Sequence, residues 1–360
     1  VGSPDRTDMA NARCIVLIGS HIGENLHNSQ VQTLVQALER GATLITVDPR
    51  FSVAASKSAH WLPIKPGTDI ALLLAWMHVI IDEKRYDIPY IEKHANGFDK
   101  LKEHVADKTP EWAYPLTGLK PGLIRDSARF IAGARPASLV HPGRRTTWYG
   151  DDTQRSRAVA MLNVLLGSWN REGGFFKPEK VKLPNYPLPA YPKPKYHTGD
   201  AYPGKWPFAP QGVTNGVIDA SIGEDAFFKG WLVYGTNLPQ TIPAVEDKLK
   251  AAADSLELVV VVETMPSEMT GYADVILPEC TYLERYDDLR NSGERHPSLA
   301  LRMPAFEPKY DSKPGWWIAR ELAHRIGLSD YFPWEDSIAY AEQRVKSAGY
   351  DCNVLRSTGV

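Results

Sequence analysis

Short apolar runs that end in small polar loops recur along the chain. Residues 14–18 lead into the polar loop 19–25, and far downstream residues 231–234 lead into the loop 235–239. Each run has the length and the continuous apolar character of a buried strand in a parallel sheet. Ligands of open α/β sheets bind beyond the carboxyl ends of such strands. The repeat therefore predicts two similar sites, for one large ligand with two arms or for two similar ligands.

The first half of the chain alternates between strand and helix patterns. The predicted strands are 15–18, 43–47 and 137–140, and the predicted helices are 29–40, 70–81 and 152–169. Residues 82–135 are predicted to be mostly helical and peripheral. This order predicts an α/β, Rossmann-like domain over residues 1–175, with a doubly wound and mainly parallel sheet.

Residues 176–225 are crowded with proline and tyrosine and show no period, which predicts a linker or an extended surface loop. A second Rossmann-like domain is predicted over 226–330, followed by a helical or irregular extension over 331–360. The strands expected in it are 231–234, 258–262 and 275–277, and the helices are 244–253 and 316–326.

Composition narrows the functional classes. The 360 residues carry a formal net charge of −2, whereas general nucleic-acid binding usually needs a basic face. The three cysteines, Cys14, Cys280 and Cys352, are far apart, so the chain has no CxxC metal or cluster motif. The longest apolar run, residues 70–81, is too short to span a bilayer and is predicted to be a buried helix.

The loops after the predicted strands carry candidate binding groups. Asp48 follows the second strand, at the position where an acidic residue accepts hydrogen bonds from ribose hydroxyls. Arg50 is suited to stack on a base or to pair with a phosphate, although a plain turn with a surface ion pair explains the same residues equally well. Glu263 stands after its strand as Asp48 does. The loop 19–25 is not GxGxxG, so a standard nicotinamide dinucleotide site has weak support.

The loop after strand 137–140 combines a histidine with two arginines. Arg144 and Arg145 are placed to clamp an anionic substrate or a phosphate with bidentate hydrogen bonds. His141 is either part of this site or a hydrogen-bonded histidine of the core. Cys280 has no histidine partner in the pattern, which favours a buried structural thiol over a nucleophile.

Together these segments resemble the molybdopterin oxidoreductase (dimethyl-sulfoxide-reductase) family over essentially the whole chain. The carrying segments are residues 15–21, 47–50, 62–69 with its IKPGTD stretch, 234–237 and 273–278. Within the family, residues 141–150 and 279–286 look closest to polysulfide and thiosulfate reductase catalytic subunits, with phenylacetyl-CoA:acceptor oxidoreductases almost as close.

The resemblance implies a molybdenum bis(molybdopterin guanine dinucleotide) cofactor, whose two nucleotide tails explain the doubled pattern. The residues implied to line one guanine dinucleotide site are Gly19, Ser20, His21, Asp48, Arg50, Pro66, Gly67 and Asp69. The residues implied to line the other are Gly235, Thr236, Asn237, Glu263, Thr264 and Asp274. Arg144, Arg145 and His141 are the catalytic candidates, with the arginines approaching the metal end of the cofactor.

The resemblance also sets expectations for a longer protein. A [4Fe-4S] cluster segment and the molybdenum-ligating side chain are expected upstream of Val1, so this segment is expected to supply no metal ligand and to be inactive alone. The expected partners are an iron–sulfur electron-transfer subunit and a small sulfur or anionic substrate, with a membrane anchor subunit as a further candidate. A periplasmic location follows by resemblance only, and a cytoplasmic location stays open.

Two other interpretations keep the fold. The chain can be an NAD(P)-type dehydrogenase with two dinucleotide-like halves, which the missing GxGxxG disfavours. It can also be a scaffold homologue that has lost the pterin and contains no molybdenum.

Overall fold

The structure is a computed structural model that describes residues 6–20, 22–24, 28–143, 152–204, 213–293 and 295–359, with only the backbone of residues 28 and 152. The chain forms two compact units. One comprises residues 1–179 and 294–296, and the other comprises 180–293 and 297–360. The predicted domain boundaries at 175, 225 and 330 stay a prediction.

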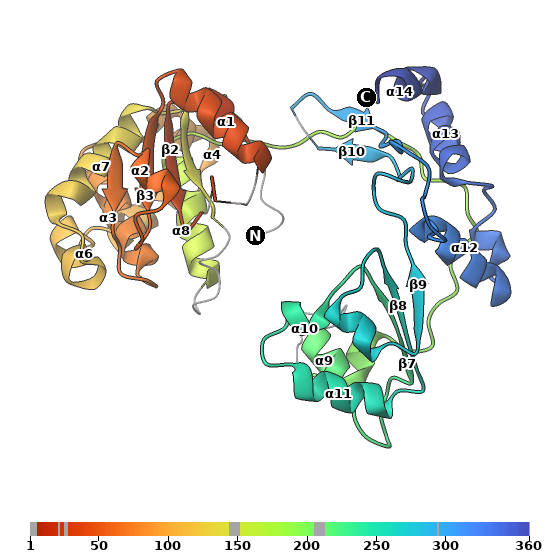
Figure 1. The fold of residues 1–360 in the computed structure, drawn as a ribbon. Helices are drawn as coiled ribbons and strands as arrows, with labels where there is room; N and C mark the ends of the chain where they lie inside the picture. Colours follow the sequence, from red (N-terminus) through yellow and green to blue (C-terminus); the bar gives the residue numbers. More distant parts are fainter. Residues whose placement is uncertain are drawn as a thin grey trace. The chain divides into compact units, whose positions relative to one another are not determined.

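The first unit is built on a parallel four-stranded sheet in the order β4-β3-β2-β5 (Figure 1). Its strands are β2 (Cys14–Ile18), β3 (Thr43–Val47), β4 (His60–Leu62) and β5 (Ser138–His141). The remaining pair, β1 (Arg6–Thr7) and β6 (Phe175–Phe176), is antiparallel.

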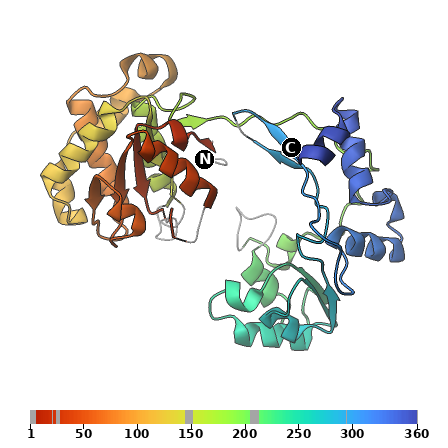
Figure 2. The same ribbon diagram turned by 45° about the horizontal axis from the view of Figure 1, so that its top comes forward.

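Helices cover both faces of this sheet, as Figure 2 shows. They are α1 (Asn28–Glu39), α2 (Val53–Ser56), α3 (Asp69–Asp82), α4 (Ile88–His94), α5 (Phe98–His104), α6 (Pro110–Thr117), α7 (Pro121–Gly133) and α8 (Asp152–Leu165). Successive side chains of a strand point to opposite faces. Val16 therefore packs in the core under α3, α7 and α8, and Leu17 packs in the core under α1. A central strand buried on both faces reads as a continuous apolar run.

The second unit holds a parallel three-stranded sheet in the order β7-β8-β9 and a separate hairpin. The sheet strands are β7 (Gly230–Tyr234), β8 (Leu258–Glu263) and β9 (Val275–Pro278), and the hairpin pairs β10 (Arg290–Ser292) with β11 (Ser298–Ala300). The helices are α9 (Thr214–Asp219), α10 (Leu238–Thr241), α11 (Glu246–Ser255), α12 (Gly315–Arg325), α13 (Ser337–Ser347) and α14 (Cys352–Thr358). The sheet packs one face on α9–α11, while Leu232 and Val275 on its other face are exposed.

The second unit begins within the proline-rich segment, whose residues 180–197 form no helix or strand, whereas a 3-10 helix (Thr198–Ala201) and α9 follow further along it. The Tyr186 ring of this segment stacks on Tyr340 of α13, with the ring centroids 5.2 Å apart. The hydroxyl of Tyr331 donates to the carbonyl of Ala190 at 3.1 Å. These contacts hold an extended chain against the unit's own surface.

The predicted mixed α/β fold with parallel sheets is confirmed. The finer prediction of two doubly wound sheets stays a prediction. The second sheet has three strands, in the order β7-β8-β9. The helix expected to reach residue 169 ends at Leu165, because Gly167 adopts a left-handed backbone with φ of 65°. Among the described residues, no helix combines the length and the apolar character needed to cross a membrane.

Candidate functional site

The two sheets end in the same local geometry. Gly19 follows β2 with φ of 59°, and Gly235 follows β7 with φ of 58°. The Gly19 amide donates to the carbonyl of Val47 at 3.4 Å, and the Gly235 amide donates to the carbonyl of Val262 at 3.1 Å. In both sheets a left-handed glycine therefore hydrogen-bonds to the neighbouring strand, and the chain turns away from the carboxyl edge.

The carbonyls that accept these bonds immediately precede the two predicted acids. Asp48 and Glu263 therefore occupy equivalent positions in the two sheets, and both are partly exposed. Oδ1 of Asp48 accepts from the Arg50 amide at 2.9 Å, and Oε1 of Glu263 accepts from the Thr264 amide at 2.8 Å. Within the described parts of the chain, the second oxygen of each carboxylate has no hydrogen-bond donor. Each acid keeps one oxygen for a ligand.

Arg50 forms an ion pair with Glu24. The other Glu24 oxygen accepts from the Val53 amide, at the start of α2, at 2.8 Å. The hydrogen bond and charge of Glu24 raise the pKa of Arg50 above its ordinary value. The turn with a surface ion pair, one of the two interpretations of this segment, is thus present, and a ligand phosphate would compete with Glu24 for the guanidinium.

A buried arginine that was not predicted contacts the backbone at the carboxyl edge of the first sheet. Arg155 of α8 is 3% exposed, and its guanidinium donates to the carbonyls of Ile18 and Pro142, both at 3.2 Å. It also acts electrostatically on Asp69, the predicted cofactor residue that begins α3. Arg155 therefore ties the ends of β2 and β5 together and supplies positive charge beneath the loop.

Asp69 is 8% exposed, and burial raises the pKa of its carboxyl, partly offset by the charge of Arg155. The folded protein thus holds this proton to a higher pH than the unfolded chain does. The contribution of Asp69 to stability is therefore greatest below the ordinary carboxyl pKa and falls as the pH rises through the raised value. Asp69→Asn is expected to remove this fall from a plot of unfolding free energy against pH.

Denaturant unfolding at a series of pH values, from below the ordinary carboxyl pKa to neutrality, measures the effect of Asp69→Asn. Asp82→Asn, at the exposed end of the same helix, is the matched control and should leave the pH profile as it is. If the Asp69→Asn variant shows the same dependence of unfolding free energy on pH as the unsubstituted protein, the pKa of the Asp69 carboxyl is not raised in the folded state.

Gly143 lies where the ends of β2 and β5 approach most closely. A Cβ atom added there would stand 2.2 Å from the carbonyl oxygen of Ile18, and the φ of 62° is left-handed. The Gly143 amide donates to Nδ1 of His141 at 3.2 Å. His141 is itself buried at the end of β5, so its predicted catalytic contact is not shown by this geometry and stays a prediction.

The remaining predicted residues of the first edge differ in their exposure to solvent. Pro66 and Gly67 are exposed in the turn before α3, and Ser20 is buried after β2. His21, Arg144 and Arg145 lie outside the described residues.

In the second unit, Asn237 is held by the segment that follows β8. Its Nδ2 donates to Glu268 at 2.5 Å, and its Oδ1 accepts from the Met269 amide at 3.2 Å. Thr236 lies in the loop after β7, and Thr264 directly follows β8. The structure thus brings these residues to one edge with Gly235.

Asp274 lies apart from this edge, and its role in a cofactor site stays a prediction. Asp274 precedes β9, and its Oδ2 accepts from the Val259 amide at the start of β8, at 2.7 Å. Because the strands are parallel, their starts meet at the amino edge, opposite to Gly235 and Glu263. Asp274 caps the sheet at its other end.

A second unpredicted group lies at the carboxyl edge of β7 and β9. The Tyr234 hydroxyl donates to Oε1 of Glu279 at 2.5 Å, and the Arg285 guanidinium pairs with the same oxygen at 2.5 Å. Burial first, and then the hydrogen bond to Glu279, raise the pKa of Tyr234 to about 12. The phenol therefore stays protonated and donates throughout the physiological range.

The cysteines and the other acids give no metal site within the described residues. Burial raises the pKa of Cys14, inside β2, to about 12, so it stays a thiol. Cys280 is fully buried and its sulfur accepts from the hydroxyl of Ser312 at 3.6 Å, which confirms the buried structural thiol.

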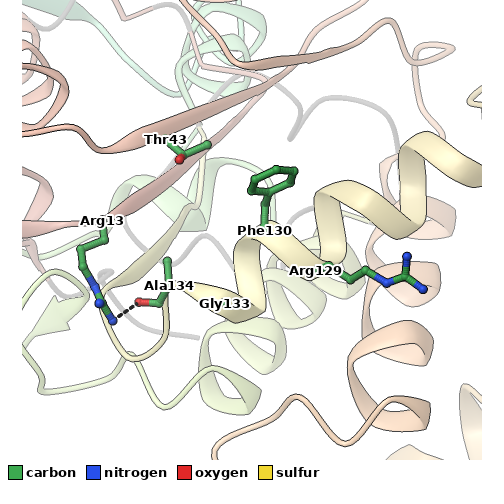
Figure 3. A pocket seen from close by; sticks show the side chains of 6 residues that line it. All are labelled: Arg13, Thr43, Arg129, Phe130, Gly133 and Ala134. Carbon is green, nitrogen blue, oxygen red and sulfur yellow. Dashed lines mark hydrogen bonds between the residues drawn. The ribbon is translucent and has the colours of Figure 1, made fainter.

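A shallow hollow of about 380 Å³ lies at the opposite, amino edge of the first sheet (Figure 3). Arg13 at its margin donates to the carbonyls of Ala134 and Arg135 at the end of α7, at 3.0 and 2.9 Å. Arg129 pairs with Glu83 at 2.8 Å. The cations of this hollow already have partners, and it lies away from the predicted cofactor residues.

The fold and the two matched edges define an α/β protein whose strand-end loops are suited to nucleotide-bearing ligands. Residues 2–325 match the family model described as molybdopterin oxidoreductase. The chain belongs to the molybdopterin oxidoreductase family.

Among its relatives is the thiosulfate reductase molybdopterin-containing subunit PhsA of Salmonella typhimurium, which is 34% identical over 91% of this chain and 45% of the relative. Dimethyl sulfoxide reductase DmsA of Escherichia coli is 26% identical over 91% of this chain and 44% of its own length. These relatives are oxidoreductase enzymes. The chain spans about half the length of the curated relatives it matches.

The solved structure of acetylene hydratase from Pelobacter acetylenicus superposes with a TM-score of 0.77. It is 24% identical and covers 99% of this chain and 53% of the hydratase chain. At this identity the match shows the fold alone.

Proposed function

We propose that this chain is the central part of a molybdenum bis(molybdopterin guanine dinucleotide) oxidoreductase. The whole protein would oxidise or reduce a sulfur compound, or a similar small anion, by two electrons in anaerobic respiration. The observation that carries the proposal is the equivalence of the two sheet edges, each with a left-handed glycine and a partly exposed acid with one free oxygen. Two equivalent cradles suit a cofactor with two equivalent nucleotide tails.

The residues present fit such a cofactor. Nothing lies within 4 Å of a Cβ atom built on Gly235, so a ligand has room to approach the backbone there. Asp48 and Glu263 would each accept hydrogen bonds from ribose hydroxyls through the free oxygen. Bound in this way, the group would supply two-electron redox chemistry at its metal.

The sulfur substrate is proposed from the relatives. Their names include a thiosulfate reductase and a dimethyl sulfoxide reductase, and also an F420-dependent formate dehydrogenase of Methanocaldococcus jannaschii. The greater similarity to the thiosulfate reductase subunit, 34% against 29% for the formate dehydrogenase, favours sulfur chemistry.

Arg144 and Arg145 are proposed to stabilise negative charge that develops on the substrate. They follow Gly143 beyond the end of β5, the edge at which ligands of such sheets bind. In the whole enzyme, replacing both with alanine is expected to reduce kcat about 100-fold or more. Unchanged turnover would rule out this role.

The proposed partners are an iron–sulfur electron-transfer subunit, which would carry electrons to or from the whole protein, and a membrane anchor subunit. The description of PhsA as a molybdopterin-containing subunit supports a multi-subunit assembly. The [4Fe-4S] cluster and the periplasmic location remain proposals of the same kind.

Calorimetric titration of this chain with guanosine diphosphate tests the two cradles. Two binding sites per chain are expected, and Asp48→Asn or Glu263→Gln should each weaken one of them about tenfold, because each removes a charged hydrogen-bond acceptor. Asp254→Asn, an exposed acid on α11, should change neither site.

A parallel titration with NAD⁺ addresses the dehydrogenase alternative. Tight NAD⁺ binding without guanosine diphosphate binding would contradict the proposal. Molybdenum analysis of the whole protein addresses the scaffold alternative, which predicts no metal.

A further inference from the structure

A cavity of about 260 Å³ in the second unit lies beside the Tyr234–Glu279 pair. Its walls come from the proline-rich segment, the ends of β7 and β9, and the helices α12 and α13. It belongs neither to the loop of Gly235 nor to that of Glu263, the two residues given to the nucleotide cradle. Pockets near this size suit small organic ligands.

Glu279 places a carboxylate in the wall of this cavity. The residue is 6% exposed, and the same oxygen, Oε1, accepts the hydrogen bond from Tyr234 and forms the ion pair with Arg285. Within the described parts of the chain no donor contacts Oε2, so this oxygen is open to a ligand that enters the cavity. The cavity therefore contains a charged acceptor that needs an N–H or O–H donor.

Gly315 keeps this arrangement open. A Cβ atom at Gly315 would lie 2.4 Å from the Tyr234 hydroxyl oxygen and 2.5 Å from Oε1 of Glu279. Only glycine leaves space at the start of α12 for the hydrogen-bonded pair. The sequence thus places a small residue where a buried carboxylate meets the cavity.

The charges that line the cavity are mainly negative. Glu279, Asp287 and Asp288 face one lining cation, Arg285, which bridges Glu279 and Asp287. Arg344 pairs with Asp288 at 3.1 Å from outside the lining. Arg302, also outside the lining, pairs with Asp287, so each of the three carboxylates has an arginine partner. The attraction of the cavity for a cation therefore depends on Oε2 of Glu279, the oxygen that these pairs leave open.

Aromatic side chains supply the rest of the wall. Trp316 of α12 and Tyr286, which follows Arg285, are both partly buried against the cavity. Indole and phenol faces attract cations, and they also cover the apolar body of a ligand. Carboxylate and aromatic faces together form a site for an organic cation.

We propose that this cavity binds a small organic ammonium or amidinium compound. Its N–H groups donate to Oε2 of Glu279, and its carbon body packs on Trp316 and Tyr286. The cavity adjoins the second cradle, since the Glu279 amide donates to the Glu263 carbonyl at 3.0 Å, but none of the cradle residues lines it. Failure of this proposal would therefore leave the proposed function standing.

Isothermal titration of this chain with phenethylammonium tests the proposal, with neutral phenethyl alcohol as the matched probe. The ammonium is expected to bind about tenfold more tightly than the alcohol, because a charged N–H donor forms a stronger hydrogen bond to a carboxylate than a neutral hydroxyl does. Glu279→Gln should weaken ammonium binding about tenfold and weaken alcohol binding clearly less, because the alcohol carries no charge. Glu257→Gln, an exposed acid before β8, should alter neither.

Trp316→Leu provides a second variant that leaves the ion pairs intact, in case Glu279→Gln does not fold as judged by circular dichroism. It should weaken ammonium binding about fivefold. Equal binding of ammonium and alcohol, unchanged ammonium affinity in these variants, or no binding of either probe would overturn the proposal.

Discussion

Replacing Arg155 with methionine is expected to lower the free energy of unfolding by about 3–5 kcal/mol. The carbonyls of Ile18 and Pro142 would lose their charged donor, and the buried Asp69 would lose its nearby positive charge. Methionine fills much of the arginine's volume, so the loss reports on the polar contacts more than on packing. Denaturant unfolding of the purified chain at pH 7 measures it.

Arg50→Met is the control for removing an arginine from the same sheet edge. Its side chain is 57% exposed and pairs only with Glu24 among the described residues, so a much smaller loss than that of Arg155→Met is expected. Adding Asp69→Asn to the Arg155 variant should restore part of the lost stability, since the uncompensated carboxylate is then absent. Equal losses from Arg155→Met and Arg50→Met would contradict the buried clamp.

Gly143→Ala is expected to destabilise the first unit by about 3 kcal/mol or more, because the new methyl group would overlap the backbone carbonyl of Ile18. Relief requires the ends of β2 and β5 to separate. Thermal unfolding together with denaturant titration measures the loss.

Gly67→Ala separates steric overlap from backbone strain. Gly67 also has a left-handed φ, 79°, but nothing lies within 4 Å of its Cβ position. Alanine there should cost only about 1–2 kcal/mol. If the two substitutions cost the same, the close approach at Gly143 would not be the reason for its glycine.

The strands were predictable because parallel strands buried on both faces leave continuous apolar runs. Residues 43–47 match β3 at both ends, and residues 15–18 match β2 to within one residue. The equivalence of Asp48 and Glu263 was also predictable, since each directly follows such a run. The end of a buried strand can be recognised in the sequence, because the apolar run stops where the chain leaves the core.

The groups that complete the edges were harder to predict. Arg155 precedes Ala158, Val159 and Leu162 at the spacing of one helix face, so the apolar periodicity of α8 did place it on the buried side. An arginine on that face is the signal that was missed. The contact between Glu279 and Tyr234 spans 45 residues and depends on strand order, which a local pattern does not contain.

Asp274 shows the limit of reasoning from motifs. The segment around it was assigned to the ligand edge because of its resemblance to family sequences, yet Asp274 stands before its strand. In a parallel sheet that order alone puts a residue at the amino edge, as the hydrogen bond to Val259 shows. Direction along the strand, which the sequence contains, was the decisive information.

The most direct test of the paired cradles is the nucleotide content of the whole protein that contains this chain. Acid hydrolysis of its cofactor, with chromatography of the released nucleotides and molybdenum analysis of the same sample, gives the ratio of nucleotide to metal. Two guanosine monophosphates for each molybdenum are expected if both edges hold a guanine tail. One nucleotide for each metal, or none, would show that the second cradle holds no such tail.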